Sequence, residues 1–360
     1  MNRESVTETG ARHGILPAQQ IRGLIAAGHI HARQDDAPSL GQAFDPPIEA
    51  EQIQPASLDL RLGHIAWRLR ASFLPGAGQC VKDCLDSSLV MHEINLDGGA
   101  VLETGCVYLV PLVERLDLPA DISARANPKS STGRLDVFTR VISDGAAQFE
   151  TMPAGYSGPL YVEIAPRTFS VLARPGDRLV QIRFRRGPLA LLGEQIVSID
   201  LKAERADGIV GWRARRHSGL VDISGVSAHQ ARDWWEPLSA PEGRLILDPE
   251  EFYILASKEA VEIPRDRAAE MAPIAPEIGE FRAHYAGFFD PGFGLATAGG
   301  AGSRAVLEVR GRDVPFMLHH GQPVAKLEFE AMADSPDNLY GQNGSHYQAQ
   351  GLRLSKHFRM

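Results

Sequence analysis

Short runs of the chain alternate between apolar and polar positions. The clearest runs are residues 160–164, 179–184, 305–309 and 324–329. A period of two is typical of β-strands that bury one face. Two further runs, 107–110 and 252–255, are rich in β-branched and aromatic side chains and follow acidic, turn-like stretches. The chain is therefore predicted to consist of short strands arranged as a β-barrel or sandwich.

Helical spacing is confined to two short segments. The first covers Pro17 to Ala27, where apolar side chains share one face and Gly28 follows in a position to end the helix. The second covers Ser227 to Trp235, with Ser227 as its N-cap. The predicted fold class is mainly β, with a few short helices.

The pattern repeats along the chain. The segment from Leu102 to Pro119 resembles the segment from Leu247 to Pro264, at a shift of 145 positions. The same shift relates Gly176 to Gly321, Phe184 to Phe329 and Trp67 to Trp212. Several matches in register favour a duplication over chance. We expect two similar units, residues 1–190 and residues 191–360.

Composition and charge narrow the class of protein. With 44% hydrophobic and 23% charged residues, the chain has enough apolar side chains to fold. Its net charge of -8 argues against a nucleic-acid partner but permits a small anionic ligand held by a few local cations. No apolar window is long enough to span a membrane, and residues 1–14 lack the apolar core of a signal peptide. A cytoplasmic protein is expected.

Zinc-dependent deaminase chemistry is not supported by the motifs. Such enzymes require H-x-E and P-C-x-x-C, and neither occurs. The cysteines Cys80, Cys84 and Cys106 have no second pair that would complete a zinc site, so we expect reduced, structural thiols and no metal-ligating residues. The chain also lacks a Walker A loop and a G-x-G-x-x-G fingerprint.

The densest candidate for ligand binding is the segment Lys129 to Arg134, KSSTGR. Two cations and three hydroxyls in six residues suit phosphate oxygens, although a solvated polar loop would look the same. The shifted positions 274–279 of the second unit lack this cluster.

Candidate acid–base chemistry rests on Glu163 and Glu308, which occupy equivalent strand positions. Burial of such a carboxylate would raise its pKa toward neutrality and make it a general base, whereas an outward-facing strand residue would have no such role. The stretch Ala286 to Phe293 offers backbone groups that can read a base edge, or forms a plain hairpin turn. The polar tail Tyr347 to Gly351 would fold over a ligand or fray.

Together these segments resemble one known family. The segments are Ile15 to Ile30, Ile53 to Gly63, Lys129 to Arg134, Ala286 to Phe293, Leu307 to Val309 and Tyr347 to Gly351. They resemble, in that order, the opening helix, signature, phosphate element, base-binding turn, catalytic strand and closing tail of the dCTP deaminases of the dUTPase-like superfamily. The phosphate element has Lys129 where the family pattern has Arg.

The resemblance implies two tandem dUTPase-like distorted jelly-roll β-barrels and hydrolysis of dCTP to dUTP and ammonia without catalytic zinc, on the route to dTTP. It implies that Glu308 activates water and that Arg134 orients this water. It assigns substrate binding to Lys129, Ser130, Ser131, Ala286, Gly287, Asp290, Tyr347, Gln348 and Gln350. It also implies Mg²⁺ carried by the triphosphate, dTTP as a candidate inhibitor, and a homo-oligomer assembled through the barrels.

The family elements are divided between the two units. The phosphate element is intact in the first, and the base-binding turn in the second, which predicts one composite site with Glu308 as the working base and Glu163 as a relic. The loop Gly294 to Gly302 would reshape this site. The alternatives are a dUTP pyrophosphatase, alone or combined with deamination, and a nucleotide-binding regulator without catalysis.

Overall fold

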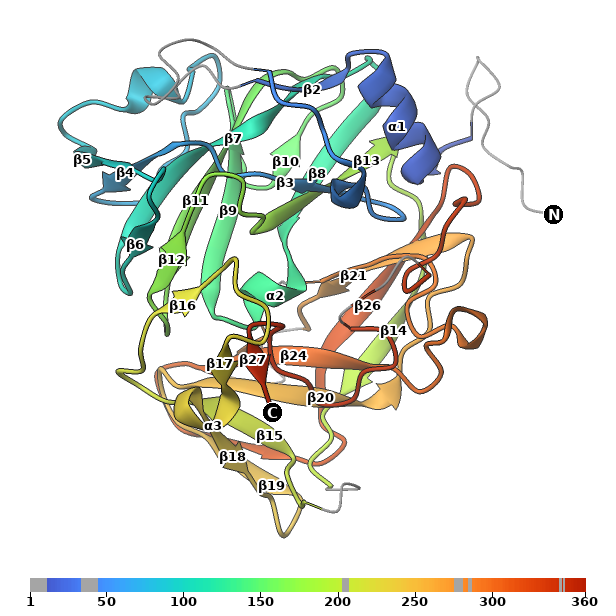
Figure 1. The fold of residues 1–360 in the computed structure, drawn as a ribbon. Helices are drawn as coiled ribbons and strands as arrows, with labels where there is room; N and C mark the ends of the chain where they lie inside the picture. The colour runs from blue at the N-terminus through green and yellow to red at the C-terminus, as the bar shows by residue number, and fades with distance from the viewer. Residues whose placement is uncertain are drawn as a thin grey trace.

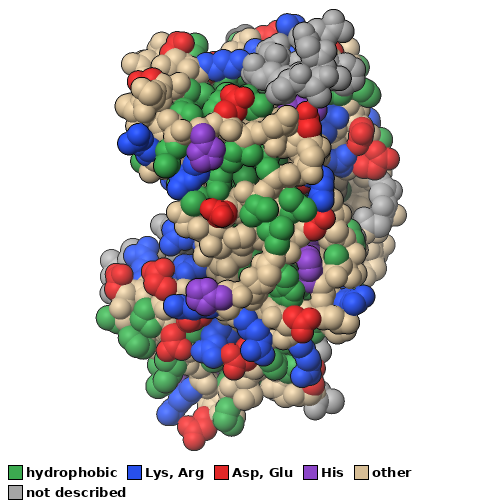
Figure 2. Space-filling model, turned by 60° about the vertical axis from the view of Figure 1, so that its left-hand side comes forward, with side chains coloured by type: hydrophobic (Ala, Val, Ile, Leu, Met, Phe, Trp, Pro, Cys, Tyr) green, Lys and Arg blue, Asp and Glu red, His purple; other side chains and the backbone are tan. Residues whose placement is uncertain are grey.

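The computed structural model describes residues 12–33, 45–202, 207–274, 281–283, 287–342, 345 and 347–360. These residues form two β-rich halves, stacked one above the other in Figure 1, and the molecular outline is indented between them in Figure 2. The prediction of a mainly β chain with a few short helices is confirmed. Within the described ranges, no helix has the length and apolar character needed to cross a membrane.

The described residues of the first half form thirteen strands. They are β1 (Gly14–Ile15), β2 (Ile30–Ala32), β3 (Leu58–Leu60), β4 (Ile65–Leu69), β5 (Val90–Asn95), β6 (Ala100–Leu102), β7 (Val107–Asp117), β8 (Ile122–Pro128), β9 (Val137–Ser143), β10 (Thr151–Met152), β11 (Ser157–Pro166), β12 (Val171–Ala173) and β13 (Val180–Arg186). One sheet has the order β5-β4-β7-β11-β9, and another has the order β1-β13-β8-β10.

The described part of the second half follows the same plan. Its strands are β14 (Leu191–Ser198), β15 (Gly211–Ala214), β16 (Val221–Asp222), β17 (His229–Gln230), β18 (Trp235–Leu238), β19 (Arg244–Leu247), β20 (Phe252–Ala260), β21 (Arg267–Ala272), β22 (Phe281–Ala283), β23 (Phe288–Phe289), β24 (Arg304–Gly311), β25 (Phe316–His319), β26 (Pro323–Ala331) and β27 (Phe358–Arg359). Its sheets have the orders β18-β15-β20-β24-β22 and β14-β26-β21-β23.

Strand pairings recur at the shift of 145 positions. The antiparallel pair β7·β11 corresponds to β20·β24, and β6·β12 corresponds to β19·β25. A tyrosine contact recurs too: the Tyr108 hydroxyl accepts from the backbone N–H of Glu103 at 3.0 Å, and the Tyr253 hydroxyl accepts from that of Asp248 at 2.9 Å. Equivalent residues therefore make equivalent contacts in the two halves.

Helices are short. Among the described residues they are α1 (Ala18–Ala26), α2 (Ser130–Gly133), α3 (Ala231–Trp234) and the 3-10 turns Ala50–Gln52, Lys82–Cys84 and Ala296–Ala298. Helix α1 confirms the first predicted helix and buries Ile21 and Leu24. The second prediction is wrong at its start: Ser227 has a left-handed φ of 53°, and α3 begins only after Gln230. The tertiary pairing of β17 with β27 takes His229–Gln230 into an extended conformation, which overrides the local capping signal.

The halves contact each other through equivalent surfaces. Arg125 lies 3.2 Å from Glu270 and Arg185 lies 2.7 Å from Glu330, and both pairs join positions related by the shift of 145. The contact is thus approximately two-fold, with a cation on the first half facing a carboxylate on the second. Strand β16 also crosses the predicted boundary, because it pairs in parallel with β12 of the first half. The division at residue 190 stays a prediction about the sequence repeat.

A deeper ion pair lies in the same contact. Arg183 on β13 lies 3.0 Å from the Asp290 carboxylate, and both side chains are almost fully buried. The Arg183 guanidinium also lies 4.1 Å from the centre of the Phe288 ring. A buried charge that loses its partner keeps the desolvation penalty without the attraction. This pair therefore couples the two halves.

Replacement of Arg183 by Met is expected to destabilise the protein by about 3 to 5 kcal/mol, because it leaves Asp290 buried without its charge partner. Chemical denaturation would measure the loss. The matched control is Arg244→Met, which removes an exposed pair with Glu242 at 3.8 Å and should cost less than about 1 kcal/mol. Equal losses in both variants would contradict the coupling.

Candidate active site

A cavity of about 590 Å³ lies between the two halves. The first half lines it with Asp59 from β3 and with the segment from Lys129 through Ser131, which opens α2. The second half lines it with Glu308 from β24 and with the C-terminal tail. The cavity thus unites segments that the sequence analysis assigned to separate units.

Glu308 is the most deeply buried of the carboxylates that line this cavity in the described part of the chain. The alternation of β24 turns its side chain inward, and the residue is only 1% exposed. Burial raises the pKa of Glu308 to about 8, against a smaller opposing effect of the Arg134 charge. Its Oε2 atom has no hydrogen-bond partner among the described residues. A carboxyl group with these properties can take up and release a proton near neutral pH.

Arg134 follows α2 and reaches Glu308 from the opposite half. Its Nε lies 3.6 Å from Glu308 Oε1, with both side chains buried. The C-terminal tail holds the rest of the guanidinium, which donates to Gln350 Oε1 at 3.1 Å and to the Arg353 carbonyl at 3.2 Å. The Tyr347 ring centre lies 4.0 Å from the guanidinium carbon. The tail therefore orients the arginine that faces the carboxylate.

Glu163, the equivalent residue of the first half, lies outside the described lining of the cavity. Its Oε1 accepts from Arg140 Nε at 3.0 Å and Nη2 at 2.5 Å, and the Arg140 guanidinium lies against the Phe149 ring at 3.8 Å. Nearby, an apolar cluster packs Leu69, Val81, Ile142 and their neighbours together. Glu163 is thus held by an arginine of its own half.

Cations gather at one end of the cavity. Lys129 forms an ion pair with the buried Asp59, and Arg178 lies 2.6 Å from Glu49. Lys356 also lines this end, and burial lowers its pKa, with the Lys129 charge as the next largest cause. Lys356 was not predicted, because a single lysine in a polar tail has no distinguishing pattern. A smaller cavity of about 250 Å³ continues from here and shares Lys129, Ser131, Arg178 and Lys356.

The predicted base-binding turn forms another wall. Asp290, Phe288 and Phe293 line the cavity, and burial raises the pKa of Asp290 although Arg183 opposes the shift. Gly287 is not part of the described lining: its carbonyl accepts from the Met271 N–H at 3.0 Å. Ala286, the remaining predicted residue, lies outside the described residues.

The predicted tail residues divide into two roles. Tyr347 and Gln350 line the cavity, as do Ser130 and Ser131 at the phosphate element. Gln348 does not. Its amide donates to the carbonyls of Gly292, Ala298 and Tyr340 at 2.9, 3.1 and 3.1 Å, and its oxygen accepts from the Gly294 N–H at 3.1 Å. Gln348 therefore fastens the loop Gly294 to Gly302 to the backbone around it, and its predicted contact with a ligand stays a prediction.

Protein ligands for a metal ion are not clustered here. Over the described ranges, no group of three or more His, Cys, Asp or Glu side chains is placed to hold one. Of the acidic residues at the cationic end, Asp59 is paired with Lys129 and Glu49 with Arg178. The cationic end of the cavity suits a phosphate chain, which can bring its own Mg²⁺.

The fold and the cavity define a β-protein with a buried glutamate–arginine pair beside a cluster of cations. Two family models match: the 2'-deoxycytidine 5'-triphosphate deaminase N-terminal domain at residues 12–188 and the C-terminal domain of the same family at residues 178–358. The chain belongs to the dCTP deaminase family.

Several similar proteins are named dCTP deaminases. A crystal structure of 2'-deoxycytidine 5'-triphosphate deaminase from Agrobacterium tumefaciens is 52% identical, covers 89% of this chain and 99% of its own, and has a TM-score of 0.82. The dCTP deaminase of Haloarcula marismortui is 30% identical over 141 residues, which are 39% of this chain and 68% of that protein. The "dCTP deaminase, dUMP-forming" of Methanoculleus marisnigri is 36% identical over 126 residues, 34% of this chain and 57% of that protein. The predicted family and dUTPase-like fold are confirmed.

Replacement of Glu308 by Gln is expected to stabilise the protein increasingly as pH rises from about 4.5 to about 8. In this window the unfolded carboxyl loses its proton while the folded one retains it, so wild-type stability falls with pH and Gln is spared that loss. The gain should reach a few kcal/mol, on the order of the pKa shift. Denaturation at a series of pH values measures it, with the exposed Glu262→Gln as control. A pH-independent difference would contradict the buried, protonated carboxyl.

Proposed function

We propose that this protein deaminates dCTP to dUTP and ammonia, with Glu308 as the general base. The family membership and the relatives' names support the substrate. The observation that carries the chemistry is the buried Glu308, with Arg134 at 3.6 Å and a pKa near 8, on the wall of a cavity that ends in cations. A group with this pKa can accept a proton from water and return it within one turnover.

In the proposed reaction, water attacks C4 of the cytosine while Glu308 takes one of its protons. The oxygen forms a bond to C4, and the C4–N bond to the exocyclic amine then breaks. Glu308 returns its proton to the departing amine, so that ammonia leaves, and the second water proton finishes on N3 of the uracil. Arg134 orients the water and stabilises the Glu308 carboxylate, since an adjacent cation favours the charged form.

The triphosphate is assigned to the cationic end. Lys129 and Lys356 supply charge, and Ser130 and Ser131 supply hydroxyl donors at the start of α2. Mg²⁺ would be bound through the phosphate oxygens and would screen their charge. The base is assigned to the turn with Asp290, whose carboxylate Arg183 holds in place.

Glu308→Gln is expected to lower kcat for ammonia release from dCTP by about 10²- to 10⁴-fold, because Gln cannot carry the proton. Glu163→Gln, the matched control, should leave kcat within a few-fold, since Glu163 lies outside the cavity. Ammonia release from dCTP, CTP and dCMP would be measured for all three proteins. Turnover that survives in E308Q and disappears in E163Q would reverse the assignment. Tight dCTP binding without ammonia release by wild type would instead support a regulator.

A second candidate is deamination coupled to pyrophosphate removal. Several relatives are named "dCTP deaminase, dUMP-forming", including those of Methanosphaera stadtmanae and Methanoculleus marisnigri. Chromatography of the products distinguishes the two: dUTP supports deamination alone, whereas dUMP and pyrophosphate support the coupled reaction.

Lys356→Met is expected to raise KM for dCTP by roughly 10- to 100-fold, the effect of losing one charge-assisted hydrogen bond to phosphate. The kcat should change less, because Lys356 lies at the cationic end and Glu308 is untouched. The exposed Arg232→Met on α3 provides a control for the loss of one positive charge. An unchanged KM would remove Lys356 from the phosphate site.

The product dUTP also suggests which metabolic route the reaction serves. Formation of dUTP would supply the synthesis of dTTP, and dTTP, which also carries a pyrimidine and a triphosphate, is proposed as an inhibitor at the same cavity. A cytoplasmic homo-oligomer that associates through the barrels completes the proposal.

A further inference from the structure

A second ion pair runs beside the Arg134–Glu308 pair. On β24, Glu308 and Arg310 are two residues apart and therefore point to the same side of the strand. Opposite them, Arg134 and Asp136 are also two residues apart. Arg310 Nη2 pairs with Asp136 Oδ2, while Arg134 Nε faces Glu308. The two pairs have opposite polarity, since the first half supplies the cation in one and the anion in the other.

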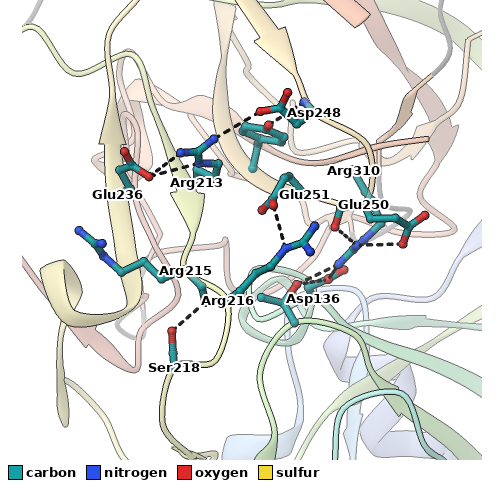
Figure 3. Close-up of polar contacts among 12 residues, drawn as sticks. Asp136, Arg213, Arg215, Arg216, Ser218, Glu236, Asp248, Glu250, Glu251 and Arg310 are labelled. Atoms are coloured by element: carbon teal, nitrogen blue, oxygen red, sulfur yellow. Dashed lines mark hydrogen bonds and ion pairs between the residues drawn. The ribbon is translucent and has the colours of Figure 1, made fainter. Parts of the chain in front are cut away.

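The second pair is firmly embedded. Asp136 is fully buried, and the Arg310 side chain is 13% exposed. Thr168 of the first half connects both partners: its hydroxyl donates to Asp136 Oδ2 at 2.6 Å and accepts from Arg310 Nη2 at 2.9 Å. The contacts of Arg310 with Asp136 and Glu250 appear in Figure 3.

The other carboxylate near Arg310, that of Glu250, is too exposed to hold the guanidinium as firmly as Asp136 does. The Glu250 carboxylate lies 3.6 Å from Arg310 Nη1, but its side chain is 63% exposed and also lies 3.7 Å from Arg167. The Arg310 guanidinium also donates to the Glu250 carbonyl. Asp136 is therefore the buried anion that fixes Arg310. By contrast, Arg134 is the charged group that acts on Glu308 from across the contact.

The backbone at Asp136 is unusual. Its φ of 54° lies in the left-handed region, which residues other than glycine seldom occupy, although asparagine and aspartate do so more often than most. An aspartate held there with its carboxylate fully buried is sustained by its surroundings, in particular by Arg310 and Thr168. The same segment carries Arg134 two residues earlier. Its placement therefore constrains the backbone from which Arg134 extends, while the C-terminal tail holds the outer nitrogens of the guanidinium.

We propose that Asp136 and Arg310 are positioning residues that set the Arg134 guanidinium against the Glu308 carboxylate. The 3.6 Å separation of Arg134 Nε and Glu308 Oε1 is too long for a hydrogen bond that would hold the pair by itself. The neighbouring ion pair joins the same two segments and fixes their register. This inference rests on the proposed role of Glu308 and deepens it.

The test compares Asp136→Asn with Arg310→Gln. Asn accepts the left-handed backbone and has the shape of Asp without the charge. The variants change the net charge near Glu308 in opposite directions. A through-space effect would therefore shift the acid limb of the kcat–pH profile downward in D136N and upward in R310Q. Displacement of Arg134 would instead move this limb upward in both, because Glu308 loses the cation that favours its charged form.

We expect both variants to lower kcat for dCTP by roughly 10-fold or more, to keep KM within a few-fold, and to move the acid limb up by about 0.5 to 1 pH unit. The double variant should resemble the single ones, since the pair acts as a unit. Arg213→Gln is the control: Arg213 lies in the same view of Figure 3 but pairs with Glu236 at 2.7 Å and Asp248 at 3.4 Å. It should leave kcat and the pH profile unchanged.

A second readout needs no activity. The gain in stability of E308Q over its parent, followed against pH, reports the Glu308 pKa in the folded protein. In the D136N and R310Q backgrounds, the pH range over which this gain in stability increases should extend to higher pH. The measurement stands even if dCTP is not the substrate. A failure of the proposed function is thereby separated from a failure of this inference.

Opposite shifts in the two variants, or an unchanged window in both, would overturn the positioning role. If D136N does not fold, Arg310→Lys provides the test: it keeps the charge and loses the second nitrogen of the guanidinium fork. It should show the same upward shift, smaller in size. An unshifted R310K with normal kcat would overturn the proposal equally.

Discussion

The structure depends on one constraint: a carboxylate buried at 1% exposure needs a cation, and the cation comes from the other half of the chain. Glu308 and Arg134 meet only when the two β-rich halves are packed together. Burial raises the pKa of the acid and the guanidinium opposes that rise, so the balance between them sets the protonation of Glu308. The protonation of Glu308 therefore depends directly on the association of the two halves.

The same constraint explains how a duplicated fold becomes asymmetric. Equivalent surfaces of the halves face each other, and two equal residues of like charge would repel across such a contact. Instead Arg125 faces Glu270 and Arg185 faces Glu330. The pairing of cations on the first half with carboxylates on the second stabilises this arrangement. The two equivalent glutamates differ in a similar way: Glu308 lines the cavity, whereas Glu163 accepts a hydrogen bond from Arg140 of its own half.

The predictable part of the site was the part with local signals. The hydroxyl and cation cluster of KSSTGR, and a glutamate on an apolar strand, are short patterns, and both reach the cavity. Lys356, Asp136 and Arg183 had no such pattern, because each acts on a residue far away in the sequence. Gln348 was predicted to contact the ligand, but the structure gives it four bonds to the backbone around the loop Gly294 to Gly302. The residue type of Gln348 alone could not distinguish a contact with a ligand from hydrogen bonds to the surrounding backbone.

By itself, the sequence determined the strands, the repeat and the family, because alternation, a constant shift and short motifs are properties of neighbouring residues. The tertiary structure alone decided which residues hold the arginine beside Glu308 and how deeply this pair is buried. Those facts depend on buried ion pairs between the two halves, whose partners lie more than a hundred positions apart in the sequence. The helix expected at Ser227 shows the same principle at small scale, since the pairing of β17 with a strand from the C-terminus overrode the local capping signal.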